Sequence, residues 1–369
     1  MSRPVTVLIL APAAPSGAHP LEAHLDAVRG ALAVRHAAGF SAAAADAVVV
    51  HREPPDDLPF GERLRRLVRD HVTGGVVVLG AGAMPLATEA DRRRFVEAAR
   101  AERPAALANN AYSADVLAIA DAARALRDLP PDLATDNALP RWLSEVAGVP
   151  VQDIAGRRDL AFDVDSPLDV MLLDGAGDGV AGLPRLPAAD GEPVRQRLAA
   201  LRTLAADPAG ELLLTGRVNG DDLRAVERLS RARTRVLIEE RGLRTASLAA
   251  QRGRRNRRPP RSLLARLLDA GGPESLGEIV AAHADGALVD TRVLMAARTG
   301  ADEQAWPPPE DRFASDLLLA DRVQDPWLRA LTASAAAAPV PILLGAHSLV
   351  GPGAVLALGV ARNDASDEE

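Results

Sequence analysis

The chain has 369 residues, a formal net charge of −7 and 48% apolar residues, which is typical of a folded protein with a mildly acidic surface. This charge provides no general attraction toward nucleic acid or an anionic membrane. The absence of cysteine excludes disulfides, zinc–thiolate sites and thiol nucleophiles, and the absence of lysine leaves arginine to bind any anion.

The first half of the chain alternates apolar strands with amphipathic helices. We expect strands at residues 5–10, 46–51, 74–80 and 104–110. We expect helices at residues 21–39, 60–72, 88–102 and 135–148, with Thr88 as a helix cap. Such alternation indicates an α/β fold whose sheet is largely parallel and covered on both faces.

The stretch RRDLAFDVDSPLDVMLL, residues 157–173, places two carboxylates two positions apart. Apolar and polar residues alternate up to residue 165, which predicts a strand with Asp163 and Asp165 on one face, about 7 Å apart at about 3.4 Å per residue. Two carboxylates at this spacing can share a magnesium ion with substrate phosphates.

The same stretch also has a purely structural interpretation. Ser166, Pro167 and Asp169 form a capping box with proline at the first helical position, so a helix over 166–173 is expected. On this interpretation Asp165 only supports the turn. We expect the helix to close the sheet of the first domain.

The second half is mainly helical and follows a loop at 174–193 that is rich in glycine, aspartate and proline. We expect helices at 194–206, 220–232, 261–270, 273–284 and 325–337, and strands at 235–239, 286–295 and 340–345. The apolar residues from 342 to 359 are also typical of a buried strand. The pattern predicts a first domain at 1–175, a second, mixed and helix-rich α/β domain at 190–361, and a disordered polar tail at 362–369.

The segments TDNAL (135–139) and DVDSPLD (163–169) resemble the closing part of GT-A-type nucleotidyltransferases. The similarity covers roughly residues 1–173 and is greatest to the 2-phospho-lactate guanylyltransferase family, with molybdenum-cofactor nucleotidyltransferases more distant. The segments at 74–99 and 103–119 follow in a compatible order. The resemblance implies a GT-A or Rossmann-like sheet and, as activity, guanylyl transfer with magnesium held by Asp163 and Asp165.

Several polar residues and glycines lie at or just after the ends of expected strands, where doubly wound sheets bind ligands, and Asp136 and Asn137 lie in the first turn of the helix expected at 135–148. Glycine backbone N–H groups can face a phosphate, and asparagine amides can bind a base edge or sugar hydroxyls, although turns use the same residue types. The candidate nucleotide-binding or substrate-binding residues are Gly80, Gly82, Asn109, Asn110, Ser113, Asp115, Asp136 and Asn137.

The sequence departs from the nucleotidyltransferase pattern at two places. No carboxylate occurs at Gly82 or Ala83, and the first loop, 11–24, has no arginine or lysine, so that His19 and His24 are its only candidate cations. Nucleotidyl transfer needs a cation near the bridging oxygens. Two functions therefore stay open: a divergent nucleotidyltransferase-like protein, or a catalytically inactive ligand-binding or interaction protein derived from that fold.

Other features are weaker. Six arginines lie between residues 252 and 261, which favours a solvated loop over a phosphate-closing or nucleic-acid-binding segment. The neighbours His347 and Ser348 have no acid at a readable spacing to orient the histidine. We expect a small-molecule nucleotide or phosphorylated metabolite as partner, neither membrane nor nucleic acid, and a cytoplasmic location because no signal peptide is apparent.

Overall fold

The computed structural model describes residues 3–52, 58–154, 156–174, 180–240, 243 and 259–359. Within these ranges the chain forms two compact units. The first consists mainly of residues 3–165 and 180–185, and the second of residues 166–174, 186–240 and 260–359.

The described part of the first unit contains a mixed sheet in the order β2-β1-β3-β5-β4-β6. Strand β5 is antiparallel to both neighbours, and the other pairings are parallel. The strands are β1 (Val5–Leu10), β2 (Ala47–His51), β3 (Gly75–Gly80), β4 (Ala106–Ala108), β5 (Val116–Ile119) and β6 (Val151–Asp153). The helices are α1 (Pro20–Ala42), α2 (Phe60–His71), α3 (Glu89–Ala99), α4 (Ala122–Ala125) and α5 (Leu139–Glu145), with 3₁₀ turns η1 (Asp136–Ala138) and η2 (Arg158–Ala161).

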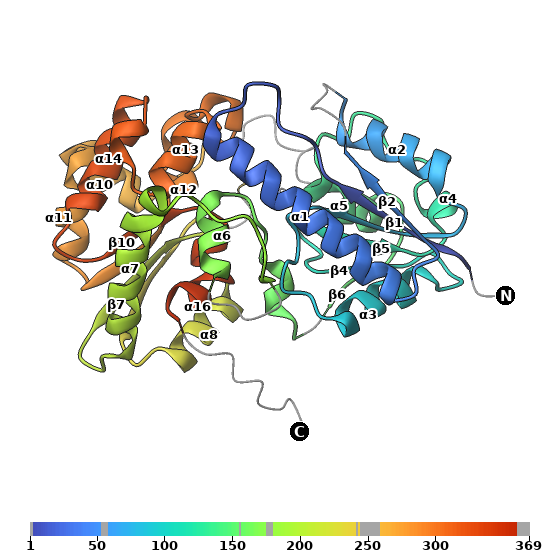
Figure 1. The fold of residues 1–369 in the computed structure, drawn as a ribbon, viewed down its shortest axis with the longest axis horizontal. Coiled ribbons are helices and arrows are strands. Elements are labelled where there is room, and N and C mark those ends of the chain that lie inside the picture. The colour runs from blue at the N-terminus through green and yellow to red at the C-terminus, as the bar shows by residue number, and fades with distance from the viewer. Residues whose placement is uncertain are drawn as a thin grey trace. The chain divides into compact units, whose positions relative to one another are not determined.

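Side chains alternate between the two faces of this sheet, as a two-residue period requires. On one face Val7 and Leu79 pack with Phe40 of α1 and Phe95 of α3. The opposite face packs against α2, α4 and α5. Figure 1 shows α1 and α3 on one side of the strands and α2 and α4 on the other. The prediction of an α/β fold with a parallel-dominated sheet is thereby confirmed.

The first unit departs from the predictions in two respects. Strands β5 and β6 and helix α4 were not expected, and β5 forms where the turn at 109–115 folds residues 116–119 back between β3 and β4. The strand expected at 157–165 is absent: residues 158–161 form η2, and Asp163 makes only an isolated bridge to Ala83. Leu160, Phe162 and Val164 are nevertheless buried, so the apolar alternation reflects burial rather than a sheet.

The described part of the second unit contains a four-stranded parallel sheet in the order β10-β9-β7-β8. Its strands are β7 (Glu211–Gly216), β8 (Arg233–Ile238), β9 (Gly286–Asp290) and β10 (Ile342–Gly345). Its helices are α6 (Pro167–Leu173), α7 (Ala188–Ala206), α8 (Gly220–Leu229), α10 (Leu263–Gly271), α11 (Leu276–Ala281), α12 (Thr291–Thr299), α13 (Pro309–Asp316), α14 (Pro326–Ala337), α15 (His347–Val350) and α16 (Gly353–Ala357). The 3₁₀ turns are η4 (Pro273–Ser275), η5 (Glu303–Ala305) and η6 (Ala320–Arg322).

Helix α6 forms where the capping box predicts it, because the Ser166 hydroxyl accepts from the Asp169 N–H and the Asp169 carboxylate accepts from the Ser166 N–H. It packs against α13 and α16 of the second unit. The expectation that it closes the first sheet is therefore wrong. All seven of its residues are buried, and a helix apolar on every side needs neighbours all around it.

Elsewhere in the second unit the apolar runs were misread as long strands. The strand expected at 286–295 ends at Asp290, whose carboxylate accepts from the Arg292 N–H and begins α12. The apolar run after β10 forms the short helices α15 and α16, and neither β7 nor α13 was expected. Residues 252–258, the tail 362–369 and part of the 174–193 loop lie outside the described residues. Among the residues that are described, no helix has the length and apolar character needed to cross a bilayer.

The buried side chain of His36 makes the stability of the first unit depend on pH. His36 on α1 is 1% exposed and lies beside the backbone of Ala81 and Ala83. Burial and the nearby Arg92 and Arg35 guanidiniums lower the pKa of His36 from 6.5 to about 3. His36 is therefore neutral in the folded protein at pH values where the unfolded chain is protonated.

Because the unfolded state binds this proton more tightly, stability should fall as pH decreases below 6.5. Between pH 7 and pH 5 we expect His36 to account for a loss of about 2 kcal/mol in the free energy of unfolding. Urea denaturation at both pH values should show a much smaller difference for His36→Leu. Phe40→Leu, a core change on the same helix, should destabilise the protein equally at both. An unchanged pH difference in His36→Leu would contradict the assignment.

Candidate functional site

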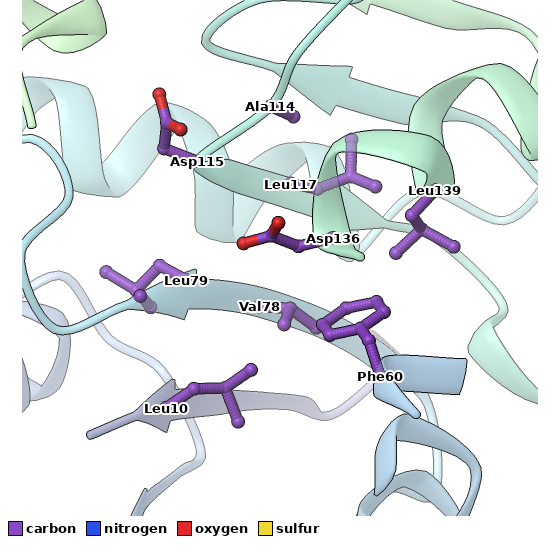
Figure 2. Close-up of a pocket in the computed structure, with 10 residues that line it drawn as sticks. Leu10, Phe60, Val78, Leu79, Ala114, Asp115, Leu117, Asp136 and Leu139 are labelled. Atoms are coloured by element: carbon purple, nitrogen blue, oxygen red, sulfur yellow. The ribbon is translucent and has the colours of Figure 1, made fainter. Parts of the chain in front are cut away.

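A small, open pocket lies at the edge of the first sheet where β1 and β3 end. Strands β2 and β3 lie on opposite sides of β1, so the order of the sheet changes direction between β1 and β3. Open α/β sheets bind ligands at such a switch point, outside the carboxyl ends of the strands. The lining residues are Leu10, Phe60, Val78, Leu79, Gly80, Ala114, Asp115, Leu117, Asp136 and Leu139 (Figure 2).

The pocket combines an apolar wall with two carboxylates. The aromatic ring of Phe60 and several aliphatic side chains provide the wall, and the ten lining residues include no arginine or histidine. In Figure 2 the Asp136 carboxylate lies in the space between β3 and β5, whereas the Asp115 carboxylate is directed away from the centre of the pocket. Asp136 is therefore the carboxylate placed to meet a ligand.

Asn109 is a positioning residue for this pocket. Its side-chain oxygen accepts hydrogen bonds from the N–H groups of Asp115 (3.0 Å) and Val116 (3.2 Å). Its side-chain nitrogen donates to Asp115 Oδ2 (3.0 Å) and to the Leu160 carbonyl (2.9 Å). These four bonds use both donors and both acceptor positions of the amide. Asn109 therefore has no hydrogen-bonding capacity left for a ligand.

The other polar candidates around this turn connect two segments of the pocket. Asn110 accepts from the Tyr112 N–H through Oδ1 (3.0 Å). The Ser113 hydroxyl donates to Asn137 Oδ1, and the Asn137 N–H donates to Asp136 Oδ1 (2.8 Å). Neither Asn110, Ser113 nor Asn137 lines the pocket. The Ser113–Asn137 bond fixes the loop before β5 against the segment that carries Asp136, whereas the Asn110 bond stays within the loop.

The two candidate glycines have different roles. Gly80 lines the pocket, and a Cβ added to it would meet no atom within 4 Å. Gly82 is buried, and a Cβ there would lie 2.7 Å from Asp163 Oδ1 and 2.8 Å from the Val164 carbonyl oxygen. Gly82 thus permits close packing of two chain segments, and Gly80 leaves space at the pocket.

Asp163 and Asp165 lie in the extended segment that follows η2. Asp163 is bridged to Ala83, and Asp165 forms an ion pair with Arg29 of α1 at 3.2 Å. The Arg29 Nε also donates to the Val164 carbonyl (3.0 Å). The Arg29 guanidinium occupies the side of Asp165 where a metal ion would otherwise bind the carboxylate. Among the described residues, no group of three or more histidine, aspartate or glutamate side chains is suited to hold a metal. Magnesium binding stays a prediction.

His19 of the first loop has a structural role, and a buried ion pair connects two strand ends in the second unit. The His19 side chain caps α1, accepting from the Leu21 N–H (3.3 Å). In the second unit Asp290 pairs with Arg217 at 2.6 and 3.0 Å, at the ends of β9 and β7. Burial alone would raise the pKa of Asp290, but Arg217 and the nearby His347 outweigh it and hold the pKa below its usual value.

Sequence reasoning missed the apolar half of the site. Leu10 is the last residue of β1 and Phe60 the first residue of α2, and Leu139 begins α5. Leu10 and Phe60 stand at ends of expected elements, where a switch-point argument would have placed a binding wall once the strand order was known, whereas Leu139 lies inside the helix expected at 135–148. The sequence alone does not supply that order.

The chain was compared with protein-family models and with curated proteins. No family model matches it, and no curated protein matches it. The resemblance to nucleotidyltransferases therefore stays a hypothesis based on the segments at 135–139 and 163–169.

The contrast between the two glycines is testable. Gly82→Ala should destabilise the protein by about 1–3 kcal/mol, the usual cost of overpacking, because a backbone carbonyl cannot move aside easily. Gly80→Ala should leave stability nearly unchanged while narrowing the pocket. Thermal denaturation of both variants measures the difference, and equal melting temperatures would contradict the packing role of Gly82.

Proposed function

We propose that the first unit binds a nucleotide, or a related phosphorylated small molecule, with its flat ring in the pocket between β1 and β3. The observation that carries the proposal is the position of this pocket at the switch point of the sheet. Pockets with an apolar wall and a few converging polar groups are the usual form of small-molecule sites.

The chemistry of the lining supports a ring that carries N–H donors. Phe60 and the aliphatic wall suit a flat apolar surface, and the Asp136 carboxylate accepts hydrogen bonds only. Guanine has a ring N–H and an amino group side by side, which a carboxylate can bind together. Because no lining side chain is basic, phosphates would extend outside the pocket.

Guanylyl transfer is the catalytic form of this proposal, and it rests on the resemblance of residues 135–139 and 163–169. Transfer requires positive charge at the bridging oxygens, from a metal or a basic side chain. The alternative is binding without catalysis. The absence of lysine from the chain and of basic residues from the lining favours this alternative.

Thermal denaturation with guanosine, GTP, adenosine and ribose 5-phosphate, each with and without magnesium, tests the proposal. A ligand that binds only the folded state raises stability by about 2.7 kcal/mol at 100 times its Kd. We expect guanosine and GTP to raise the melting temperature of the wild type. If GTP raises the melting temperature only when magnesium is present, while guanosine raises it without magnesium, the result would support a metal ion near the phosphates.

Asp136→Asn should abolish the guanosine shift because the amide presents a donor where the base also presents donors. Asp128→Asn, which removes an exposed carboxylate from the same region, is the matched control and should retain the shift. A wild type that responds to none of these compounds would contradict the proposed function. An unchanged response in Asp136→Asn would contradict the assigned contact.

A further inference from the structure

Tyr112 is an exposed aromatic residue in a chain that has few of them. It is the only tyrosine, aromatic residues make up 2% of the sequence, and Tyr112 is 72% exposed. It lies in the turn between β4 and β5, whose neighbouring residues Ala114 and Asp115 line the pocket. The ring therefore contributes little to the core of the first unit.

The backbone of this turn is firmly held although the ring is exposed. The Tyr112 N–H donates to Asn110 Oδ1 (3.0 Å), and the Tyr112 carbonyl accepts from Nη2 of the buried Arg141 (3.2 Å). The N–H of Ala111 donates to the Asp153 carboxylate. A ring on such a backbone has only its own side-chain torsions to lose on binding, so its immobilisation costs little entropy.

The turn is also connected to both walls of the pocket. Ala114 is two residues after Tyr112, a span of at most about 7 Å, which a tyrosine side chain can cover. Ser113 bonds to Asn137, the neighbour of Asp136 on the other wall. Tyr112 is thus two residues from the lining segment that begins β5, and the residue after it bonds to the segment that carries Asp136.

We propose that Tyr112 stacks on the flat ring of the bound molecule and covers the pocket from the solvent side. This inference rests on the proposed function and narrows the ligand to a molecule with an aromatic heterocycle. A sugar phosphate without such a ring has no face for Tyr112. Base–aromatic stacking tolerates different bases, so Tyr112 would add affinity and Asp136 would select among bases.

Isothermal titration with guanosine tests the contribution of the ring. Tyr112→Ala should weaken binding by about tenfold, within the range found when a stacked aromatic is removed, and Tyr112→Phe should bind like the wild type. Because the side chain is exposed, both variants should melt at the wild-type temperature without ligand. Val34→Ala, a truncation of another exposed apolar side chain at 70% exposure, is the matched control and should not affect binding.

A second readout uses the fact that the chain has one tyrosine. Nitration by tetranitromethane reports on Tyr112 alone, and saturating guanosine should slow it several-fold while ribose 5-phosphate should not. Guanosine binding with equal affinity in Tyr112→Ala, together with an unchanged nitration rate, would overturn the stacking proposal and leave the pocket assignment intact. Failure of the wild type to bind guanosine, GTP, adenosine or ribose 5-phosphate would overturn the proposed function, and the stacking proposal with it, whereas binding of ribose 5-phosphate alone would overturn the stacking proposal.

Discussion

The first unit depends on the four hydrogen bonds of one buried amide, that of Asn109. They close the turn after β4 and bind it to the Leu160 carbonyl of the segment before α6. The turn returns the chain as β5, antiparallel between β3 and β4. Because β5 runs against its neighbours, its beginning lies at the edge where β1 and β3 end. Ala114, Asp115 and Leu117 can line the pocket for this reason.

The same geometry explains why the acidic pair is not the centre of the site in this structure. Gly82 brings the loop after β3 against Asp163 and Val164, and Arg29 fixes the following residue, Asp165. These contacts hold the segment between η2 and α6 in place. The carboxylate that enters the pocket is Asp136, at the start of η1, which the sequence suggests only as one of several polar candidates.

The second unit uses buried charge at the corresponding edge of its own sheet. Asp290 and Arg217 connect the ends of β9 and β7, and Arg292 pairs with Asp316 of α13 (2.7 Å). Removing such charges from water costs several kcal/mol per ion, so their pairing does little for net stability. A buried carboxylate without its guanidinium is far more costly, and this penalty disfavours other arrangements of the strand ends.

The sequence by itself determined the α/β class, the positions of β1, β2 and β3 and of the helices that follow them, and the caps at Thr88 and Ser166, because these depend on local periodicity and local hydrogen bonds. It did not determine that residues 116–119 form a strand, that α6 packs in the second unit, or that apolar alternation at 160–164 occurs outside a sheet. Only the tertiary structure decided which of the candidate binding residues lie at the pocket. Asn109 and Asp136 look alike as polar residues beside apolar elements, yet one is saturated by its own turn and the other enters the pocket. Three of the four Asn109 bonds are made within its turn, but the bond to Leu160 and the position of Asp136 beside the ends of β1 and β3 depend on residues far apart in the chain, which no local pattern encodes.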